Sequence, residues 1–305
     1  MIDNAGVRPA RLAVGVISAG RVGAVLGASL ARAGHVVVAT SAVSDASLRR
    51  AEQLLPDVPV LAPDEVATRA DLVMLAVPDD VLPGMVAGLV ATGALRAGQI
   101  VAHTSGAHGV DVLTPAAELG ALPLALHPVM TFTGRSEDLE RLAACCIGVT
   151  ASGDPNSPVE PGWNVGEALV VEIGAEPVRI PEAVRPLYHA ALAHGANHLI
   201  TLLTECVGLL SQAGVAHPER LLGPLCGAAM DNALRHGDRA LTGPVARGDL
   251  STLRTHLDVL GEVAPEVVPS YRVLAARTAD RARAAGLLSD STAAEVDDLL
   301  NEEPR

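Results

Sequence analysis

The sequence contains no lysine, and arginine fills all 22 of its Lys-plus-Arg positions. A Schiff-base mechanism and any catalytic lysine are therefore excluded. Phe, Trp and Tyr together make up only 1% of the chain, and the formal net charge is −13. Surfaces that bind nucleic acid need positive charge and often stack bases on aromatic rings. We therefore expect no nucleic-acid partner and look for a small-molecule substrate.

Cysteine and long apolar runs are also scarce. The four cysteines, Cys145, Cys146, Cys206 and Cys226, have no metal-site spacing, so we expect no metal and a reducing cytoplasm. Residues 1–11 lack the apolar core of a secretory signal. No apolar run reaches the roughly 18 residues of a membrane span without glycine, proline or charge, so we expect no membrane partner.

Apolar runs alternate with helical patterns up to about residue 180. Strands that are apolar throughout are typical of a parallel sheet with helices on both faces. From residue 181 only helical patterns occur, beginning with one long helix over 182–212. The sequence therefore predicts an α/β fold with a doubly wound parallel sheet over residues 8–180, followed by an all-helical domain over residues 181–300.

The expected elements can be given by range. Strands are expected at 12–17, 35–40, 58–61, 72–77, 100–103, 122–127, 145–150 and 177–180. Helices are expected from residue 21 and at 45–55, 64–69, 81–91, 110–119, 164–174, 218–236, 249–262, 266–286 and 291–301. A stretch rich in proline, glycine and serine predicts a loop at 152–163.

The turn after the first strand is the most informative stretch. It reads Ser18-Ala19-Gly20-Arg21-Val22-Gly23, which is the dinucleotide fingerprint G-x-G-x-x-G with serine in the first glycine place. A bare backbone at Gly20 would let a pyrophosphate approach, and a small residue at Gly23 would let helix and strand pack closely. Free N–H groups at the helix start would favour the phosphate charge. Five residues of this turn are predicted to bind the cofactor: Ser18, Ala19, Gly20, Arg21 and Val22.

The end of the second predicted strand bears on the choice of cofactor. An NAD site would carry an acidic residue there for the ribose hydroxyls, and none occurs before Asp45. Ser41 and Ser44 offer donors and Arg49 a cation, so we predict that NADP(H) is preferred over NAD(H). We interpret Arg50 as part of a solvated helix face. The strand predicted at 72–77 ends in Ala76 and Val77, followed by Pro78. These three residues are expected to line the cofactor, and a purely structural role at the end of a strand explains them equally well.

Three loops carry candidate substrate-binding residues, because function concentrates where loops leave a rigid scaffold. In the first, Ser105 follows His103 and could donate to a carboxylate or carbonyl. In the second, His127 ends a strand; each histidine could touch substrate or be a hydrogen-bonded structural residue. In the third, Arg247 could clamp a carboxylate, or could be a surface arginine beside Asp249 as a helix N-cap.

The long helix carries Asn197 amid apolar neighbours, which predicts a buried amide that needs partners. A nicotinamide, a substrate or backbone groups could supply them. Small residues would let another surface pack closely on this helix: Ala190, Ala191, Ala193, Gly195 and Ala196. These faces indicate a homodimer through the helical domain.

Several motifs together resemble a known family: VISAGRVG, AVPDD, HTSGA, HPVMTF, ALAHGANHLITLL and LTGPVARGD. They resemble the Rossmann-like proteins of the DUF2520 group, in the wider superfamily of 6-phosphogluconate dehydrogenase and pyrroline-5-carboxylate reductase. Some relatives are thought to be alternative ketopantoate reductases, so the resemblance implies NADPH-dependent reduction of a small 2-oxo acid. Similarity to β-hydroxyacid dehydrogenases implies that the turn at Ser105 and Gly106 holds the substrate carboxylate.

One position departs from this resemblance. β-Hydroxyacid dehydrogenases carry a lysine four residues before an asparagine; Asn197 is similar to the asparagine, but Ala193 stands in the lysine's place. In ketone reduction the proton must then come from His103, His127, His194 or water. Two alternatives remain open: an imine reductase acting on a pyrroline carboxylate, which is already protonated, and a non-catalytic NADP-binding regulator or scaffold. The expected catalytic residues are His103, Ser105, His127, Asn197 and Arg247.

Overall fold

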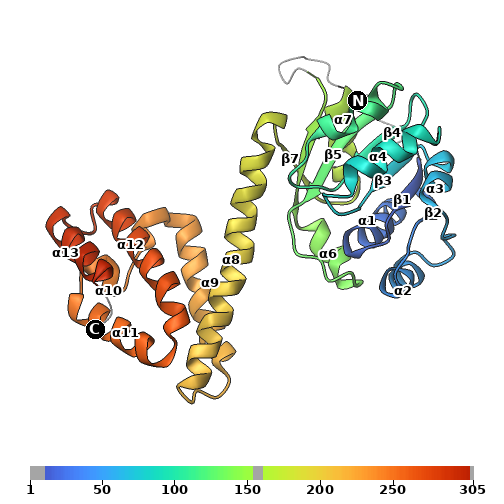
Figure 1. Ribbon diagram of the computed structural model, residues 1–305. Helices are drawn as coiled ribbons and strands as arrows, with labels where there is room; N and C mark the ends of the chain where they lie inside the picture. Colours follow the sequence, from blue (N-terminus) through green and yellow to red (C-terminus); the bar gives the residue numbers. More distant parts are fainter. Residues whose placement is uncertain (1–10, 154–160, 303–305) are drawn as a thin grey trace, which may run out of the picture. The chain divides into compact units, whose positions relative to one another are not determined.

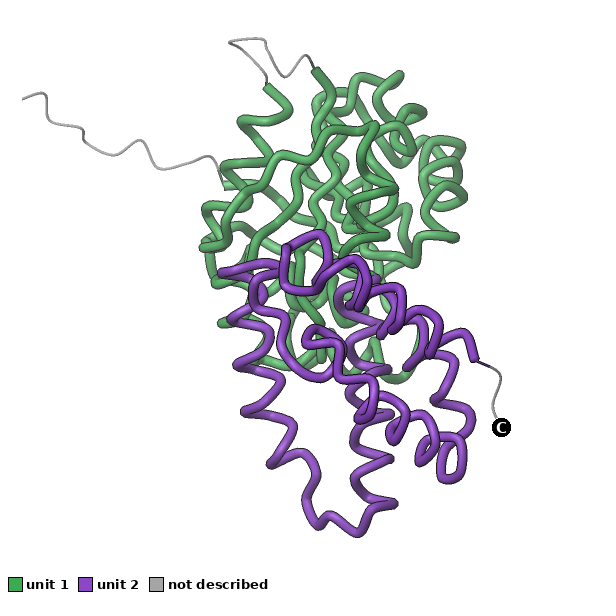
Figure 2. The backbone as a smooth tube through the Cα atoms, turned by 90° about the vertical axis from the view of Figure 1, so that its left-hand side faces the viewer, with its two compact units in different colours: residues 1–193 green, residues 194–305 purple. Residues whose placement is uncertain are grey.

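The computed structural model (Figure 1) describes residues 11–153 and 161–302. The chain divides into two compact units, residues 1–193 and 194–305, which Figure 2 colours separately. The division falls inside the long helix α8 (Arg185–Gln212), whereas the sequence pattern changes near residue 180. We refer to the two parts as unit 1 and unit 2.

Unit 1 is built on a seven-stranded sheet with the order β2-β1-β3-β4-β5-β6-β7. Its strands are β1 (Ala13–Ile17), β2 (Val36–Thr40), β3 (Leu72–Leu75), β4 (Ile100–His103), β5 (Leu122–Pro128), β6 (Cys146–Ala151) and β7 (Glu176–Arg179). β1 to β5 run parallel, so their carboxyl ends share one edge of the sheet. β6 pairs antiparallel with β5, and β7 runs parallel to β6.

The predicted parallel arrangement is therefore confirmed for β1 to β5, whereas β6 and β7 run in the opposite direction. Four consecutive residues of β6 are buried, as in the parallel strand β3. An apolar run reports burial on both faces of a sheet and carries no information about strand direction. The rest of the prediction, a doubly wound sheet followed by a helical region, is confirmed.

Helices lie on both faces of the sheet. They are α1 (Arg21–Arg32), α2 (Asp45–Leu54), α3 (Pro63–Arg69), α4 (Leu82–Ala91), η1 (Val110–Leu113), α5 (Thr114–Ala117), α6 (Glu137–Ala143) and α7 (Pro161–Glu172). Val16 of β1 packs in one apolar cluster with Leu26 of α1, while the next residue, Ile17, packs in a second cluster with Val66 of α3. Successive strand residues point to opposite faces, so each strand contributes to both layers of the core.

Three local predictions differ from the structure. The strand expected at 58–61 is reduced to a single bridge between Thr40 and Val60. The helix expected at 110–119 is split into η1 and α5, with a proline in the first turn of α5. The helix α6 was not predicted, because its seven residues are too few for a clear apolar period. Residues 154–160 of the predicted loop lie outside the described residues, and residue 161 already begins α7.

Unit 2 is helical throughout its described residues, 194–302. The short helix η2 (Glu182–Val184) leads into α8, which is followed by α9 (Pro218–His236), η3 (Gly237–Ala240), α10 (Pro244–Arg247), α11 (Leu250–Val263), η4 (Pro265–Val267), α12 (Val268–Ala284) and α13 (Asp290–Asn301). Its core packs Leu253 of α11 against Ala279 of α12 and Val296 of α13. Of all the helices within the described ranges, none combines the length and apolarity needed to cross a bilayer.

Candidate functional site

The turn between β1 and α1 has the geometry expected of a phosphate-binding turn. Ser18 adopts a left-handed backbone with φ +77°, a conformation that costs a serine free energy and that glycine would adopt freely. Two hydrogen bonds hold it there: the Ser18 N–H donates to Ser41 Oγ at 2.9 Å, and the Ala19 N–H donates to the Ser41 carbonyl at 2.7 Å. The structure thus gives buried Ser41 a role in shaping the turn from the neighbouring strand.

The two glycines of the turn differ in what surrounds them. A Cβ on Gly23 would overlap the Ser18 carbonyl and lie 2.9 Å from the Ala76 Cβ, so close packing of helix on sheet requires glycine there. A Cβ on Gly20 would meet only Ser18 Oγ, at 3.5 Å. Gly20 is also the N-cap of α1, a helix whose first turn has neither a side-chain cap nor an acidic residue. These residues fit an approaching pyrophosphate, whose charge the free N–H groups would favour.

Basic side chains gather beside this turn. Arg21 Cγ and Arg50 Nε lie 3.0 Å and 2.7 Å from the position that a Cβ on Gly134 would occupy. Arg50 is half-buried there, so its interpretation as part of a solvated helix face was wrong. Arg49 is the exposed one of the pair, and the Ser44 hydroxyl caps α2 by accepting from the Ser47 N–H at 3.2 Å. The helical period alone could not separate Arg49 from Arg50, because Gly134, which lies beside Arg50, is distant in sequence.

His103 lies at the end of β4 and is fully buried. Its Nε2 is 2.8 Å from the Gly109 carbonyl, and its Nδ1 accepts from the Ser105 N–H at 3.2 Å. Burial lowers the pKa of His103 to about 4, so the ring is neutral at pH 7. Both ring nitrogens shape the loop that follows β4. Ser105 is buried in this loop, and its hydroxyl accepts from the His108 N–H at 3.0 Å.

His127 is placed differently, because within the described residues only its Nδ1 has a hydrogen-bond partner. Its Nδ1 is 2.8 Å from the Tyr188 hydroxyl, and its Nε2 lies 2.9 Å from where a Cβ on Gly106 would stand. His189 reaches the same point with its Cδ2, at 2.6 Å, and its ring meets the His127 ring edge-on. Burial, with Arg185 and His189 nearby, lowers the pKa of His127 to about 4.

Arg185 is the residue of this site that the sequence analysis missed. It is fully buried at the start of α8 and makes four hydrogen bonds. Its Nε donates to Thr150 Oγ1 at 2.8 Å; its Nη atoms donate to the carbonyls of Ser105, Ala125 and Gly148 at 3.0, 3.1 and 3.0 Å. A single arginine in a helical pattern resembles any surface arginine, so the sequence contains no signal for this burial.

Glu182 fixes the same loop from the other side. Its carboxylate accepts from the Val110 N–H at 2.7 Å and occupies the space that a Cβ on Gly109 would need. Together, Arg185 and Glu182 hold the loop after β4 against the start of α8. All of these residues belong to unit 1, so they form one site whatever the placement of unit 2.

The remaining predicted residues lie in unit 2. Asn197 is exposed on α8, so the expectation of a buried amide was wrong for the single chain. Its neighbours are apolar in sequence, but that face of α8 is itself exposed. Arg247 is exposed at the end of α10, and Asp249 caps α11 by accepting from the Thr252 N–H at 3.1 Å. The N-cap interpretation of Asp249 is therefore confirmed.

A Rossmann-like domain model matches residues 1–128, and a model of the domain of unknown function DUF2520 matches residues 145–278. The chain therefore carries a Rossmann-like domain followed by a DUF2520 domain. A comparison with curated proteins found no match.

Solved structures similar to this DUF2520 protein cover nearly its whole length. A candidate NADP oxidoreductase from Bacteroides fragilis has a TM-score of 0.73 at 19% identity, covering 88% of this chain and 98% of that one. A pyrroline carboxylate reductase from Plasmodium falciparum with NADP bound has a TM-score of 0.56 at 9% identity, covering 97% and 100%. An imine reductase from Myxococcus stipitatus, in complex with NAD+, has a TM-score of 0.56 at 15% identity, covering 94% and 99%. At these identities the likeness shows the fold.

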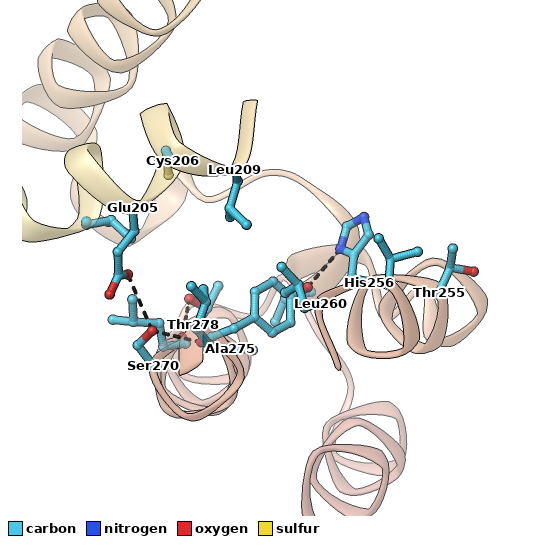
Figure 3. Close-up of a pocket in the computed structure, with 15 residues that line it drawn as sticks. Glu205, Cys206, Leu209, Thr255, His256, Leu260, Ser270, Ala275 and Thr278 are labelled. Carbon is cyan, nitrogen blue, oxygen red and sulfur yellow. Dashed lines mark hydrogen bonds between the residues drawn. The ribbon is translucent and has the colours of Figure 1, made fainter. Parts of the chain in front are cut away.

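The DUF2520 protein also has a largely apolar cavity of about 530 Å³ within unit 2, between α8, α11 and α12 (Figure 3). Its polar side chains are already paired. Ser270 donates to Glu205 at 3.4 Å, and His256 Nδ1 lies 2.8 Å from the Tyr271 hydroxyl. Across the described residues, no three metal-binding side chains come together.

Proposed function

We propose that this protein is an NADPH-dependent reductase of a small ketone that carries a carboxylate, such as ketopantoate or another 2-oxo acid. The β1–α1 turn is the observation that carries the proposal. It combines a backbone without a Cβ at Gly20, an uncapped helix start and tight packing at Gly23. These are the features that a dinucleotide pyrophosphate needs. The likeness to NADP- and NAD-bound structures supports the same cofactor class.

The order of the strands supports a substrate site near His127. β1, β3, β4 and β5 are consecutive neighbours in the sheet, and their carboxyl ends share an edge. At a strand spacing of about 4.8 Å, the end of β4 lies roughly 10 Å from the β1 turn, and the end of β5 roughly 14 Å. A dinucleotide held by its pyrophosphate at β1 would therefore extend toward Ser105, Gly106 and His127. A bound dihydronicotinamide would supply the hydride.

The preference for NADP(H) rests on charge. The adenosine ribose of a dinucleotide bound at β1 lies beyond the end of β2, where an additional phosphate would need cations. Arg21 and Arg50 converge beside Gly134 in that neighbourhood, with Arg49 exposed next to them. The proposal keeps Ser41 and Ser44 as nearby hydroxyls, although both already bond to protein groups. Ala76, Val77 and Pro78 remain proposed cofactor contacts.

In the proposed reaction, the Ser105–Gly106 turn holds the substrate carboxylate and His127 faces the carbonyl. Asn197 and Arg247 of unit 2 remain proposed substrate-binding residues. His103 shapes the loop instead of supplying a proton, because both of its ring nitrogens already have partners. The proposal includes a homodimer through unit 2 and a cytoplasmic location; all four cysteines are free thiols.

An imine substrate is the second candidate, and the state of His127 favours it. A histidine with a pKa of about 4 carries no imidazolium proton to donate at pH 7. An iminium is already protonated and needs no strong acid. A non-catalytic NADP-binding protein is the third candidate.

The test uses purified protein in two steps. Calorimetry with NADPH and NADH measures both dissociation constants, and we expect NADPH to bind at least about ten-fold more tightly, which corresponds to 1.4 kcal/mol. NADPH oxidation is then followed with a panel of 2-oxo acids, ketopantoate first, and with a pyrroline carboxylate. Turnover of a 2-oxo acid supports the first candidate, and turnover of the pyrroline alone supports the second. Tight NADPH binding without consumption, unaffected by Asn197→Ala, would favour the third.

A further inference from the structure

The proposed ketone reduction needs a proton at the carbonyl oxygen, and the residues around Gly106 offer an unusual source. His127 Nε2 is the ring nitrogen that faces the Gly106 backbone, at 2.9 Å from the missing Cβ. The opposite nitrogen, Nδ1, is not solvated but lies 2.8 Å from the hydroxyl of Tyr188 on α8. The imidazole therefore lies between the Gly106 backbone and a phenol.

The backbone of β6 makes room for this phenol. A Cβ on Gly148 would lie 2.6 Å from the Tyr188 hydroxyl oxygen and 3.1 Å from its ring carbon. Any larger residue at position 148 would push Tyr188 away from His127. The hydroxyl thus occupies a space that only glycine leaves free, in the middle of an otherwise packed strand.

A buried cation lies beside the same phenol. The guanidinium carbon of Arg185 is 5.7 Å from the centre of the Tyr188 ring, and the four acceptors of Arg185 are neutral oxygens. The charge of Arg185 therefore has no carboxylate bonded to it among these partners. Such a charge favours negative charge nearby, because attraction is strong where water is excluded.

We propose that Tyr188 supplies, through His127, the proton for the carbonyl oxygen of the substrate. The inference rests on the proposed ketone reductase function and assigns its proton source. In the resting state the Tyr188 hydroxyl donates to His127 Nδ1, which leaves Nε2 carrying the hydrogen that points toward Gly106. His127 is then the group that touches substrate, and Tyr188 acts through it.

The step balances as follows. A hydride adds to the carbonyl carbon, and the electron pair of the C=O π bond moves to oxygen. That oxygen takes the proton from His127 Nε2, whose N–H bonding pair stays on the ring, while Nδ1 takes the proton of the Tyr188 hydroxyl. The ring is neutral before and after, and the charge appears as a Tyr188 phenolate near Arg185. Water then protonates Nε2 while the Nδ1 proton returns to the Tyr188 phenolate, which restores the resting tautomer, so the net change is addition of one hydride and one proton to the ketone.

The electrostatics of the neighbouring groups agree with a neutral relay. Burial is the main cause that lowers the pKa of His127; Arg185 and His189 add to it and Asp79 opposes it. Burial raises the pKa of Tyr188, Arg185 acts to lower it, and Cys146 adds to the rise. At pH 7 both members of the pair are therefore uncharged, so the ring can pass on a proton without first becoming a cation.

The first test reads the tautomer of His127 without cofactor or turnover. Two-bond ¹H–¹⁵N NMR spectra of the labelled full chain distinguish Nδ1–H from Nε2–H imidazoles, and loss of the signal in His127→Gln assigns it. We expect the Nε2–H form in the wild type and a mixture of tautomers in Tyr188→Phe. An Nδ1–H form in the wild type would mean that His127 donates to Tyr188, and the relay would be overturned.

The second test uses a matched pair of tyrosine variants. The chain has only two tyrosines, and Tyr271 in unit 2 bonds to His256 Nδ1 at the same 2.8 Å. With a 2-oxo acid that the wild type reduces, we expect Tyr188→Phe to lower kcat about 100-fold or more, the effect of losing a general acid. In Tyr188→Phe, KM and the NADPH dissociation constant should change less than about three-fold. The control Tyr271→Phe should keep kcat within about two-fold of the wild-type value.

The outcomes separate the relay from the function on which it rests. Equal kcat values for the wild type and Tyr188→Phe overturn the relay and leave the reductase standing. If Tyr188→Phe fails to fold, His127→Gln takes its place in the same comparison. If the wild type binds NADPH but reduces no 2-oxo acid, the proposed function is overturned. The role of the relay is then overturned with it, whichever tautomer of His127 the NMR spectra show. A pyrroline carboxylate reduced equally well by Tyr188→Phe, beside a lost ketone activity, supports the relay because an iminium needs no proton.

Discussion

At the scale of single residues, the site depends on glycines whose missing side chains leave room for neighbouring atoms. Gly23, Gly106, Gly109 and Gly148 each leave space that a neighbouring side chain or backbone fills or approaches. At these positions the requirement comes from the packing of other segments and not from an unusual φ. An added methyl group there should therefore act through displacement of its neighbours.

Gly23→Ala is the sharpest case. The new Cβ would overlap the Ser18 carbonyl and press on Ala76, so α1 must shift away from β1. We expect a loss of about 1–3 kcal/mol in the free energy of unfolding, typical of overpacking, and a weaker affinity for NADPH. Denaturant unfolding followed by the single tryptophan, Trp163 of α7, measures the first effect, and calorimetry measures the second.

Gly88→Ala is the matched control. Gly88 lies inside α4, and a Cβ there would meet nothing within 4 Å. Alanine in a helix interior is favoured over glycine by about 0.5–1 kcal/mol, so this variant should be as stable as the wild type or more stable, with unchanged NADPH binding. Equal destabilisation of the two variants would show that the close packing at Gly23 is not the cause.

His103 predicts a dependence of stability on pH. Its pKa is near 4 in the folded protein and near 6.5 when exposed, so the unfolded chain binds more protons between these values. Stability should therefore fall as the pH is lowered from 6.5 to 4. Replacement by glutamine removes this contribution and should reduce the difference in unfolding free energy between pH 7 and pH 4.5 by about 2 kcal/mol. Because each protein is compared with itself at two pH values, the direct cost of the substitution cancels. If the unfolding free energies of the wild type and His103→Gln changed in parallel with pH, the prediction would be contradicted.

At the scale of elements, Arg185 connects the loop after β4 with two neighbouring strands and with its own helix. Arg185 lies on α8, and its four hydrogen bonds reach the loop after β4 and the strands β5 and β6. A lysine offers three donors on a point charge and cannot match this planar arrangement. We expect Arg185→Lys to lower the free energy of unfolding of unit 1 by about 3 kcal/mol, because several buried acceptors lose their partners.

The same Trp163 fluorescence measures this change. Arg283→Lys is the control, because Arg283 is exposed and its ion pair with Asp280, three residues earlier, is long at 3.7 Å. A change within about 0.5 kcal/mol is expected for such a surface pair. If Arg185→Lys behaves like this control, the network of Arg185 does not stabilise the edge of the sheet.

The elements also show how far a sequence predicts such a protein. The turn at Gly20, the strand β4 and the helix α9 follow from local patterns, because period and turn chemistry are properties of neighbouring residues. The direction of β6 and the burial of Arg185 do not, because both depend on contacts between segments distant in sequence. His127 was predicted from its place at a strand end, but its partner Tyr188 lies 61 residues away on another element.

At the scale of the whole molecule, the two long helices α8 and α9 are poorly covered in the single chain. Among their described residues only Arg185 and Pro218 are buried, although both helices are rich in leucine. Leu225 and Leu234 of α9 expose 66% and 82% of their surface. Such apolar faces are typical of surfaces that pack against another protein. A second copy of this chain is the partner that the proposed function includes.

The expected result is a dimer in sedimentation analysis of the full chain at micromolar concentration. Leu225→Glu combined with Leu234→Glu should produce monomers, because carboxylates resist transfer into a dry interface. Val171→Glu on α7 of unit 1 is the control: Val171 is 57% exposed and should tolerate the charge with no change in mass. A monomeric wild type would show that these leucines are not an interface between copies. Dissociation by Val171→Glu alone would instead place the interface on unit 1.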